Sequence, residues 1–149
     1  MTSESQSAAA LRDCRSALFQ NLGDPSTVSA FFDQVADDVS WTVEGTHPLA
    51  GAFTSKTEFV RATFDRLAPL MRDQVRLRLL RVFIDGDTVI AELQAGSTTL
   101  EGSPYDNRLC WVCRFAGTAA DDLIVEVHAY LDSAMVTWTV ARNERRPLW

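Results

Sequence analysis

The side chains best suited to acid–base chemistry are Glu44 and His47, at the point where the strand-like stretch Val39–Val43 runs into the turn-rich segment Gly45–Gly51. A histidine titrates near neutrality, and a carboxylate in apolar surroundings is a stronger base than one in water. We therefore expect both residues at the mouth of a pocket, as candidate catalytic groups. The alternative is a surface histidine and a solvated carboxylate.

Strand alternation sorts the residues that would line such a pocket. In the expected strands Tyr105–Phe115 and Leu123–Leu131, one face of each is mainly apolar. With their neighbours on earlier strands, the expected inward-facing residues are Trp41, Val43, Leu93, Tyr105, Asn107, Leu109, Trp111, Val127 and Ala129. Asn107 is the clearest polar group among them and is suited to polarising a carbonyl. This wall suits a small apolar molecule, unless the side chains fill the space and leave no cavity.

Two histidines and three cysteines give little support for metal or redox chemistry. Cys110 and Cys113 have C-x-x-C spacing but fall on an expected strand, where residues three apart point to opposite faces. No second cysteine pair completes a zinc site, and the histidines have no ligand spacing. No glycine-rich phosphate loop is present. We expect structural cysteines, no metal and no cofactor.

The elements that must position these residues follow from periodicity and turn signals. Leu11, Cys14, Leu18 and Leu22 recur at helical spacing, and Gly23 is placed to end that helix. Asp24-Pro25 is expected to open a short second helix with an apolar stripe from Val28 to Val35, and a strand is expected at Val39–Val43. The capping box Ser55–Glu58 opens a third helix, which carries Phe59, Phe64, Leu67 and Met71 on one side. Strands are then expected from Gln74, Thr88, Tyr105 and Leu123, followed by a last helix capped by Asp132 and ending near Val140.

Two local features of the expected strands stand out. The adjacent leucines Leu79 and Leu80 indicate a bulge, and Asp85-Gly86-Asp87 is typical of a hairpin turn. Helices placed ahead of a long meander predict an α+β fold, a curved antiparallel sheet (cone) with N-terminal helices covering its concave face. His128 would face the convex side, in packing or an interface.

Composition bounds the rest. The chain has 149 residues, enough for one domain with a core, and we expect it to span residues 8–140 between a disordered N-terminal tail at 1–7 and a C-terminal tail at 141–149. The net charge of −6 argues against nucleic acid as a partner, and the basic cluster Arg142, Arg145 and Arg146 is expected to be solvated tail. No membrane-length apolar run or secretory signal is present, so we expect a cytoplasmic protein with no membrane association.

The element order and several stretches resemble the nuclear transport factor 2-like superfamily, which includes SnoaL-type polyketide cyclases, ketosteroid isomerase and limonene epoxide hydrolase. The stretches that carry the resemblance are 21–24, 36–41, 48–51, 105–108 and 125–132. It covers residues 8 to 140 and implies an NTF2-like cone, a pocket and a homodimer through the convex face of the sheet. The fold hosts enzymes, binding modules and assembly domains alike.

The catalytic residues of the two enzymes are not found at the matching positions. The steroid-isomerase base maps to Val43, its tyrosine near Ser16 and its second acid to Trp111. A slip of one residue would place Glu44 at the base position. The epoxide-hydrolase residues are also absent: its arginine and two aspartates map near Leu93, Ala95 and Ala129, and its water-positioning pair near Trp41 and Val43.

Three functions therefore stay open. The first is a SnoaL-like enzyme catalysing proton transfer (isomerisation, cyclisation or dehydration) on a small apolar substrate, with His47 or Glu44 as base and Asn107 polarising a carbonyl. The second is a non-catalytic carrier or sensor for an apolar ligand. The third is a dimerisation module. A buried, activated His47 or Glu44 would favour the first, a sealed apolar cavity the second, and a filled cone the third.

Overall fold

A computed structural model describes residues 3–144 of the chain. Its helices are α1 (Ser3–Gln20), α2 (Val28–Phe32), α3 (Lys56–Ala62), α4 (Phe64–Leu67) and α5 (Ser133–Asn143), with 3-10 turns η1 (Asn21–Gly23) and η2 (Ala68–Leu70). Its strands are β1 (Val35–Val43), β2 (Gly51–Phe53), β3 (Arg76–Asp85), β4 (Thr88–Gly96), β5 (Arg108–Phe115) and β6 (Ile124–Leu131). The predicted α+β class is confirmed.

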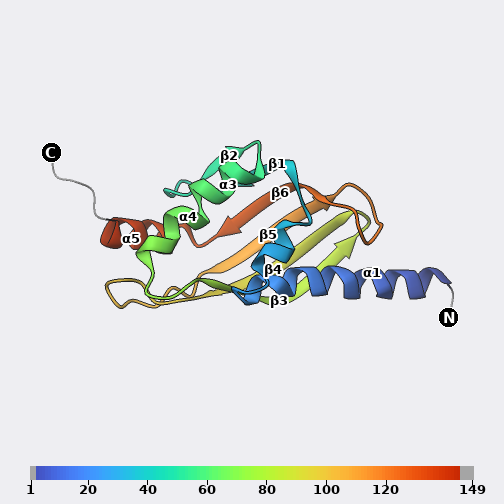
Figure 1. Ribbon diagram of the computed structural model, residues 1–149, viewed down its shortest axis with the longest axis horizontal. Coiled ribbons are helices and arrows are strands. Elements are labelled where there is room, and N and C mark those ends of the chain that lie inside the picture. The colour runs from blue at the N-terminus through green and yellow to red at the C-terminus, as the bar shows by residue number, and fades with distance from the viewer. Residues whose placement is uncertain (1–2, 145–149) are drawn as a thin grey trace.

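The six strands form one sheet in the order β2-β1-β6-β5-β4-β3. Strands β3 to β6 make the expected antiparallel meander, and β2 pairs antiparallel with β1. The pairing of β1 with β6 is parallel, however, so the sheet is mixed and not wholly antiparallel. Figure 1 shows β1 lying beside β6, with the helices at the N-terminal end of the chain over one face of the curved sheet.

Several predicted boundaries change. Helix α1 starts at Ser3, so residues 3–7, expected as a disordered tail, are helical. Helix α2 begins at Val28 and not at Pro25, and Val35 already opens β1. The helix expected from Ser55 to Met71 is divided at Thr63, whose φ of −119° and ψ of −78° depart from helical values.

Several other local predictions are confirmed. The side chain of Ser55 accepts a hydrogen bond from the Glu58 amide and caps α3, and Asp132 caps α5 through the Met135 amide. The strand register shifts between Leu79 and Arg81, which is the predicted bulge. Gly86, at φ +61°, makes the β3–β4 hairpin turn.

The C-terminal segment also differs from the expectation. Helix α5 continues to Asn143, so the first residues of the predicted tail are helical, and Arg142 lies 5.8 Å from the centre of the Trp138 ring. Arg145 and Arg146 of the basic cluster lie outside the described residues. Among those described, no helix is long and apolar enough to cross a membrane.

Aromatic side chains from the helices and the sheet form the core between them. Phe59 of α3 stacks on Trp41 of β1 with ring centroids 3.7 Å apart, and Trp41 meets Trp111 of β5 edge to face at 5.1 Å. Phe31 of α2 lies 6.0 Å from Trp111. These contacts hold the helices on the sheet and fill most of the space beneath it.

A buried arginine connects α1 to the loop between β5 and β6. The Arg15 side chain is 2% exposed and donates to the carbonyls of Gly117, Ala119 and Ala120, at 3.4, 3.0 and 3.4 Å. Its guanidinium lies 3.7 Å from the centre of the Phe115 ring. Burial lowers the pKa of Arg15 by removing its charge from water.

Candidate functional site

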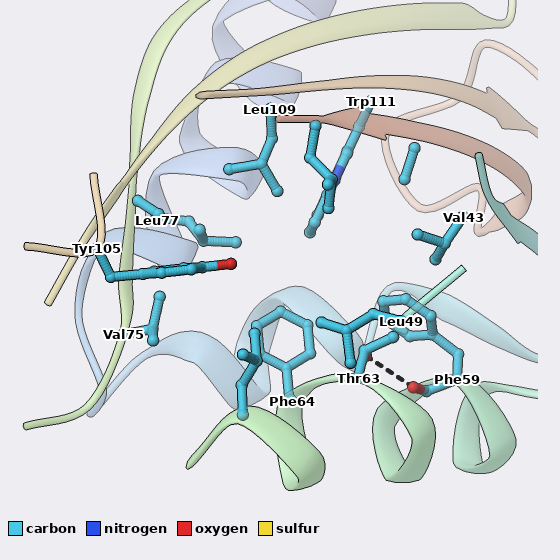
Figure 2. A pocket seen from close by; sticks show the side chains of 14 residues that line it. Val43, Leu49, Phe59, Thr63, Phe64, Val75, Leu77, Tyr105, Leu109 and Trp111 are labelled. Atoms are coloured by element: carbon cyan, nitrogen blue, oxygen red, sulfur yellow. Dashed lines mark hydrogen bonds between the residues drawn. The ribbon is translucent and has the colours of Figure 1, made fainter. Parts of the chain in front are cut away.

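An apolar cavity of about 50 Å³ remains between the concave face of the sheet and the helices (Figure 2). The strands contribute Val43, Leu77, Ala95, Leu109, Trp111, Ala129 and Leu131 to its wall. Helices α3 and α4 contribute Phe59, Phe64 and Leu67, and the segments between elements contribute Leu49, Thr63, Val75 and Tyr105. The cone is therefore largely filled, but space for a small molecule is left.

The predicted pocket residues fall into two groups. Val43, Tyr105, Leu109, Trp111 and Ala129 line the cavity. Trp41, Leu93 and Val127 do not line it but are completely buried in the surrounding core. Strand alternation found the correct face of each strand because that face is the one covered by helices. It gave no indication of which of these side chains border empty space.

Tyr105 brings the polar group into the cavity, since its hydroxyl points inward from the segment just before β5 (Figure 2). Burial raises the pKa of Tyr105 to about 12, and the nearby Asp132 carboxylate adds to this effect, while a hydrogen bond with Asn107 opposes it. The phenol therefore stays protonated near neutral pH. It can donate a hydrogen bond to an oxygen atom of a bound molecule.

Asn107 lies beside this tyrosine and does not line the cavity. Its side chain is 1% exposed and bonds the backbone of Asp132 twice. The carboxamide oxygen accepts from the Asp132 amide at 2.9 Å, and the nitrogen donates to the Asp132 carbonyl at 3.2 Å. Asn107 thus joins the start of β5 to the end of β6 and supports the position of Tyr105. The sequence predicted an inward-facing amide at this position but not its hydrogen bonds to the backbone of Asp132.

His47 is buried, at 5% exposed, and both its ring nitrogens are engaged by its own loop. The Leu49 amide donates to Nδ1 at 3.1 Å, so Nδ1 carries no proton. Nε2 lies 3.0 Å from the Glu44 carbonyl and is the nitrogen that donates to it. The imidazole braces the segment between β1 and β2, which places Leu49 in the cavity wall, and His47 itself does not line the cavity.

Glu44 points to the other side of the sheet. Its carboxylate oxygen Oε1 lies 3.2 Å from Nδ1 of His128, and both side chains are about 40% exposed. Because Val43 faces the cavity, the next residue along the strand faces the convex side. The structure thus separates the Glu44 carboxylate from the His47 ring and pairs it with His128. The sequence correctly placed His128 on the convex face.

The two closely spaced cysteines behave as their strand position predicted. Cys110 pairs with Tyr130 on the convex side, whereas Cys113 pairs with Val127 on the concave side and is fully buried. Both are free thiols. Burial raises the pKa of each thiol, which keeps the reactive thiolate form scarce. Residues 3–144, apart from those with unassigned side chains, bring no three His, Cys, Asp or Glu side chains together as metal ligands.

The curved sheet, the covering helices and the apolar cavity between them define an NTF2-like protein. Residues 17–127 match the family described as "SnoaL-like domain". The chain therefore belongs to the SnoaL-like domain family. An NTF2-like protein from Burkholderia thailandensis E264 superposes with a TM-score of 0.67 at 25% identity, over 91% of this chain and 98% of that one.

Two fungal proteins extend the comparison. The chain is 29% identical over 130 residues to "Dimerizing cyclase phiC" from Fungal sp. (strain ATCC 74256). The match covers 85% of this chain but 55% of phiC, so the chain spans about half the length of that relative. PrhC from Penicillium brasilianum NBRC 6234 has the same fold, with a TM-score of 0.68 at 9% identity over 89% of each chain.

Proposed function

We propose that this protein binds a small, mostly apolar molecule that carries one hydrogen-bond-accepting oxygen, such as a ketone. The observation that carries the proposal is the hydroxyl of Tyr105, which is directed into a mainly apolar cavity. Thr63 also lines the cavity, but its hydroxyl already donates a hydrogen bond to the Phe59 carbonyl at 2.7 Å. A ligand oxygen would be oriented by Tyr105, and its hydrocarbon part by contact and desolvation.

The size of the cavity sets the class of ligand. A volume of about 50 Å³ holds a few heavy atoms, well below the ~300 Å³ at the lower end of sites for drug-sized molecules. Cyclopentanone is a suitable probe, because methylenecyclopentane has the same shape and lacks the acceptor oxygen. A larger ligand would have to displace lining side chains or extend out of the cavity.

Isothermal titration calorimetry with this ligand pair tests the proposal. We expect the wild type to bind both, with cyclopentanone favoured. In Tyr105→Phe, cyclopentanone should lose about fivefold to tenfold in affinity, the equivalent of about 1 kcal/mol for one hydrogen bond, while methylenecyclopentane binds as before. If neither ligand binds the wild type, or if Tyr105→Phe weakens both equally, Tyr105 does not orient a bound oxygen.

Proton-transfer catalysis is the second candidate, supported by the similarity to a cyclase and by a phenol available as proton donor. The placements of His47, Glu44 and Asn107 favour binding over catalysis, because none of these side chains lines the cavity. Deuterium exchange at the α-carbons of cyclopentanone in D₂O, followed by NMR, separates the two. A catalyst accelerates exchange in a Tyr105-dependent way, whereas a carrier binds the ketone and leaves exchange at the buffer rate.

A homodimer through the convex face is a further part of the proposal. A row of residues crosses that face through cross-strand pairs from Phe83 to Ile90, Val112 and His128. Phe83 is 48% exposed and Tyr130, on the same face, 47%. Exposed aromatic side chains on a broad sheet are typical of an interface. Light scattering should give a dimer mass, and Phe83→Lys should lower it to that of a monomer.

A further inference from the structure

A second hollow lies directly against the cavity. This outer groove has a volume of about 510 Å³ and is bordered by α2, α3, α4, η2 and the segment leading into β3. Four side chains line both spaces and form the partition between them: Phe64, Leu67, Val75 and Leu77. The two spaces are therefore separated by the thickness of single side chains.

The four side chains of this partition differ in how deeply they are buried. Leu67 and Leu77 are buried, at 9% and 4% exposed, whereas Phe64 and Val75 are half-buried. Phe64 follows the break between α3 and α4 at Thr63, and its ring meets Phe32 and Phe59 edge to face at 5.8 and 5.9 Å. Because Phe64 lines both spaces and is less buried than the leucines, it is the member at which we expect a ligand to pass between them.

The two spaces differ in chemistry. The inner cavity is apolar except for the hydroxyls of Tyr105 and Thr63, whereas the groove is bordered by the exposed side chains of Asp65, Arg72, Asp73 and Gln74. The loop carrying this polar border is fixed, because the Asp73 carboxylate accepts from the Ser97 hydroxyl and the Thr98 amide. The groove floor remains apolar, so an occupant would meet apolar surface first and polar groups at the outer end.

We propose that the groove is the outer subsite for an elongated, amphipathic small molecule. Its oxygen-bearing apolar end occupies the inner cavity, its chain passes the Phe64 partition, and its polar end lies among the charged and amide side chains of the groove. This inference rests on the proposed binding function. It explains how a cavity of about 50 Å³ can serve a larger ligand, because most of that ligand is accommodated outside it.

The test compares a short ketone, 2-butanone, with 9-hydroxy-2-nonanone, which adds a methylene chain and a terminal hydroxyl. Ala68→Trp fills the groove from an exposed position that does not line the inner cavity. We expect the wild type to bind the long ketone at least tenfold more tightly, since each further methylene buried in the groove adds to the hydrophobic contribution. Ala68→Trp should abolish that advantage and leave the affinity for 2-butanone unchanged.

Phe64→Ala provides the opposite change, because it opens the partition and should increase the affinity for the long ketone further. Equal affinities of the two ketones for the wild type, or an Ala68→Trp variant that keeps the long-chain advantage, would overturn the outer subsite while leaving the proposed function intact. Failure of both ketones to bind the wild type would overturn both.

Discussion

Replacing Ala95 by valine adds two methyl groups to the wall of the inner cavity. Ala95 lies on β4 opposite Leu77 and is 1% exposed. At ~24 cal/mol per Å³, leaving a cavity of about 50 Å³ empty costs roughly 1 kcal/mol of stability. Valine also suits a strand. We expect Ala95→Val to raise the free energy of unfolding by about 1 kcal/mol, or Tm by roughly 2–4 °C, and to abolish cyclopentanone binding.

Ala91→Val is the matched control. Ala91 lies on the same face of the same strand and is fully buried, but it does not line the cavity. The same two methyl groups should overpack the core there and cost ~1–3 kcal/mol. Urea unfolding followed by fluorescence of the buried Trp41 and Trp111 measures both variants. Equal destabilisation of the two, or cyclopentanone binding retained in Ala95→Val, would refute the reasoning.

Three further outcomes follow from buried polar groups. The folded pKa of Tyr105, about 12, lies above its unfolded value of about 10, so its contribution to stability is present below pH 10 and lost as the pH rises towards 12. At pH 11 the wild type should have lost about 1 kcal/mol relative to Tyr105→Phe, measured by urea unfolding. His47→Ala removes both ring hydrogen bonds and should cost ~1–3 kcal/mol, with faster hydrogen exchange at the Leu49 amide; unchanged exchange would contradict the bracing role. Arg15→Met removes three hydrogen bonds and the contact with Phe115, and should lower stability by about 2 kcal/mol, whereas Arg12→Met on the exposed side of α1 should have little effect.

Much of the fold was predictable because its signals are local. The caps at Ser55 and Asp132, the glycine of the β3–β4 turn and the paired leucines of the bulge each depend on neighbouring residues only. The inward faces of the strands were predictable for a related reason, since alternation along a strand needs no knowledge of its partner.

Features that depend on distant residues were not predictable. The short strand β2 exists because β1 offers it an edge, and the parallel pairing of β1 depends on where β6 lies. Glu44 and His47, three residues apart, leave the strand end on different sides. Nothing local shows that the imidazole bonds its own loop or that the carboxylate meets His128. Tyr105 was expected as a wall residue, and only the packing around it reveals its role as a hydrogen-bond donor.

The parallel pairing of β1 with β6 also orders events during synthesis. Trp41 pairs with Val127, and Val43 with Ala129, so β1 cannot join the sheet until β6 has been made. The meander from β3 to β6 pairs strands that are consecutive in the sequence and can form first, because contacts close in sequence form fastest. Val43 and Ala129 meet in the cavity wall, which is therefore completed last. The time at which refolding protein regains ligand binding should therefore report the final step of folding.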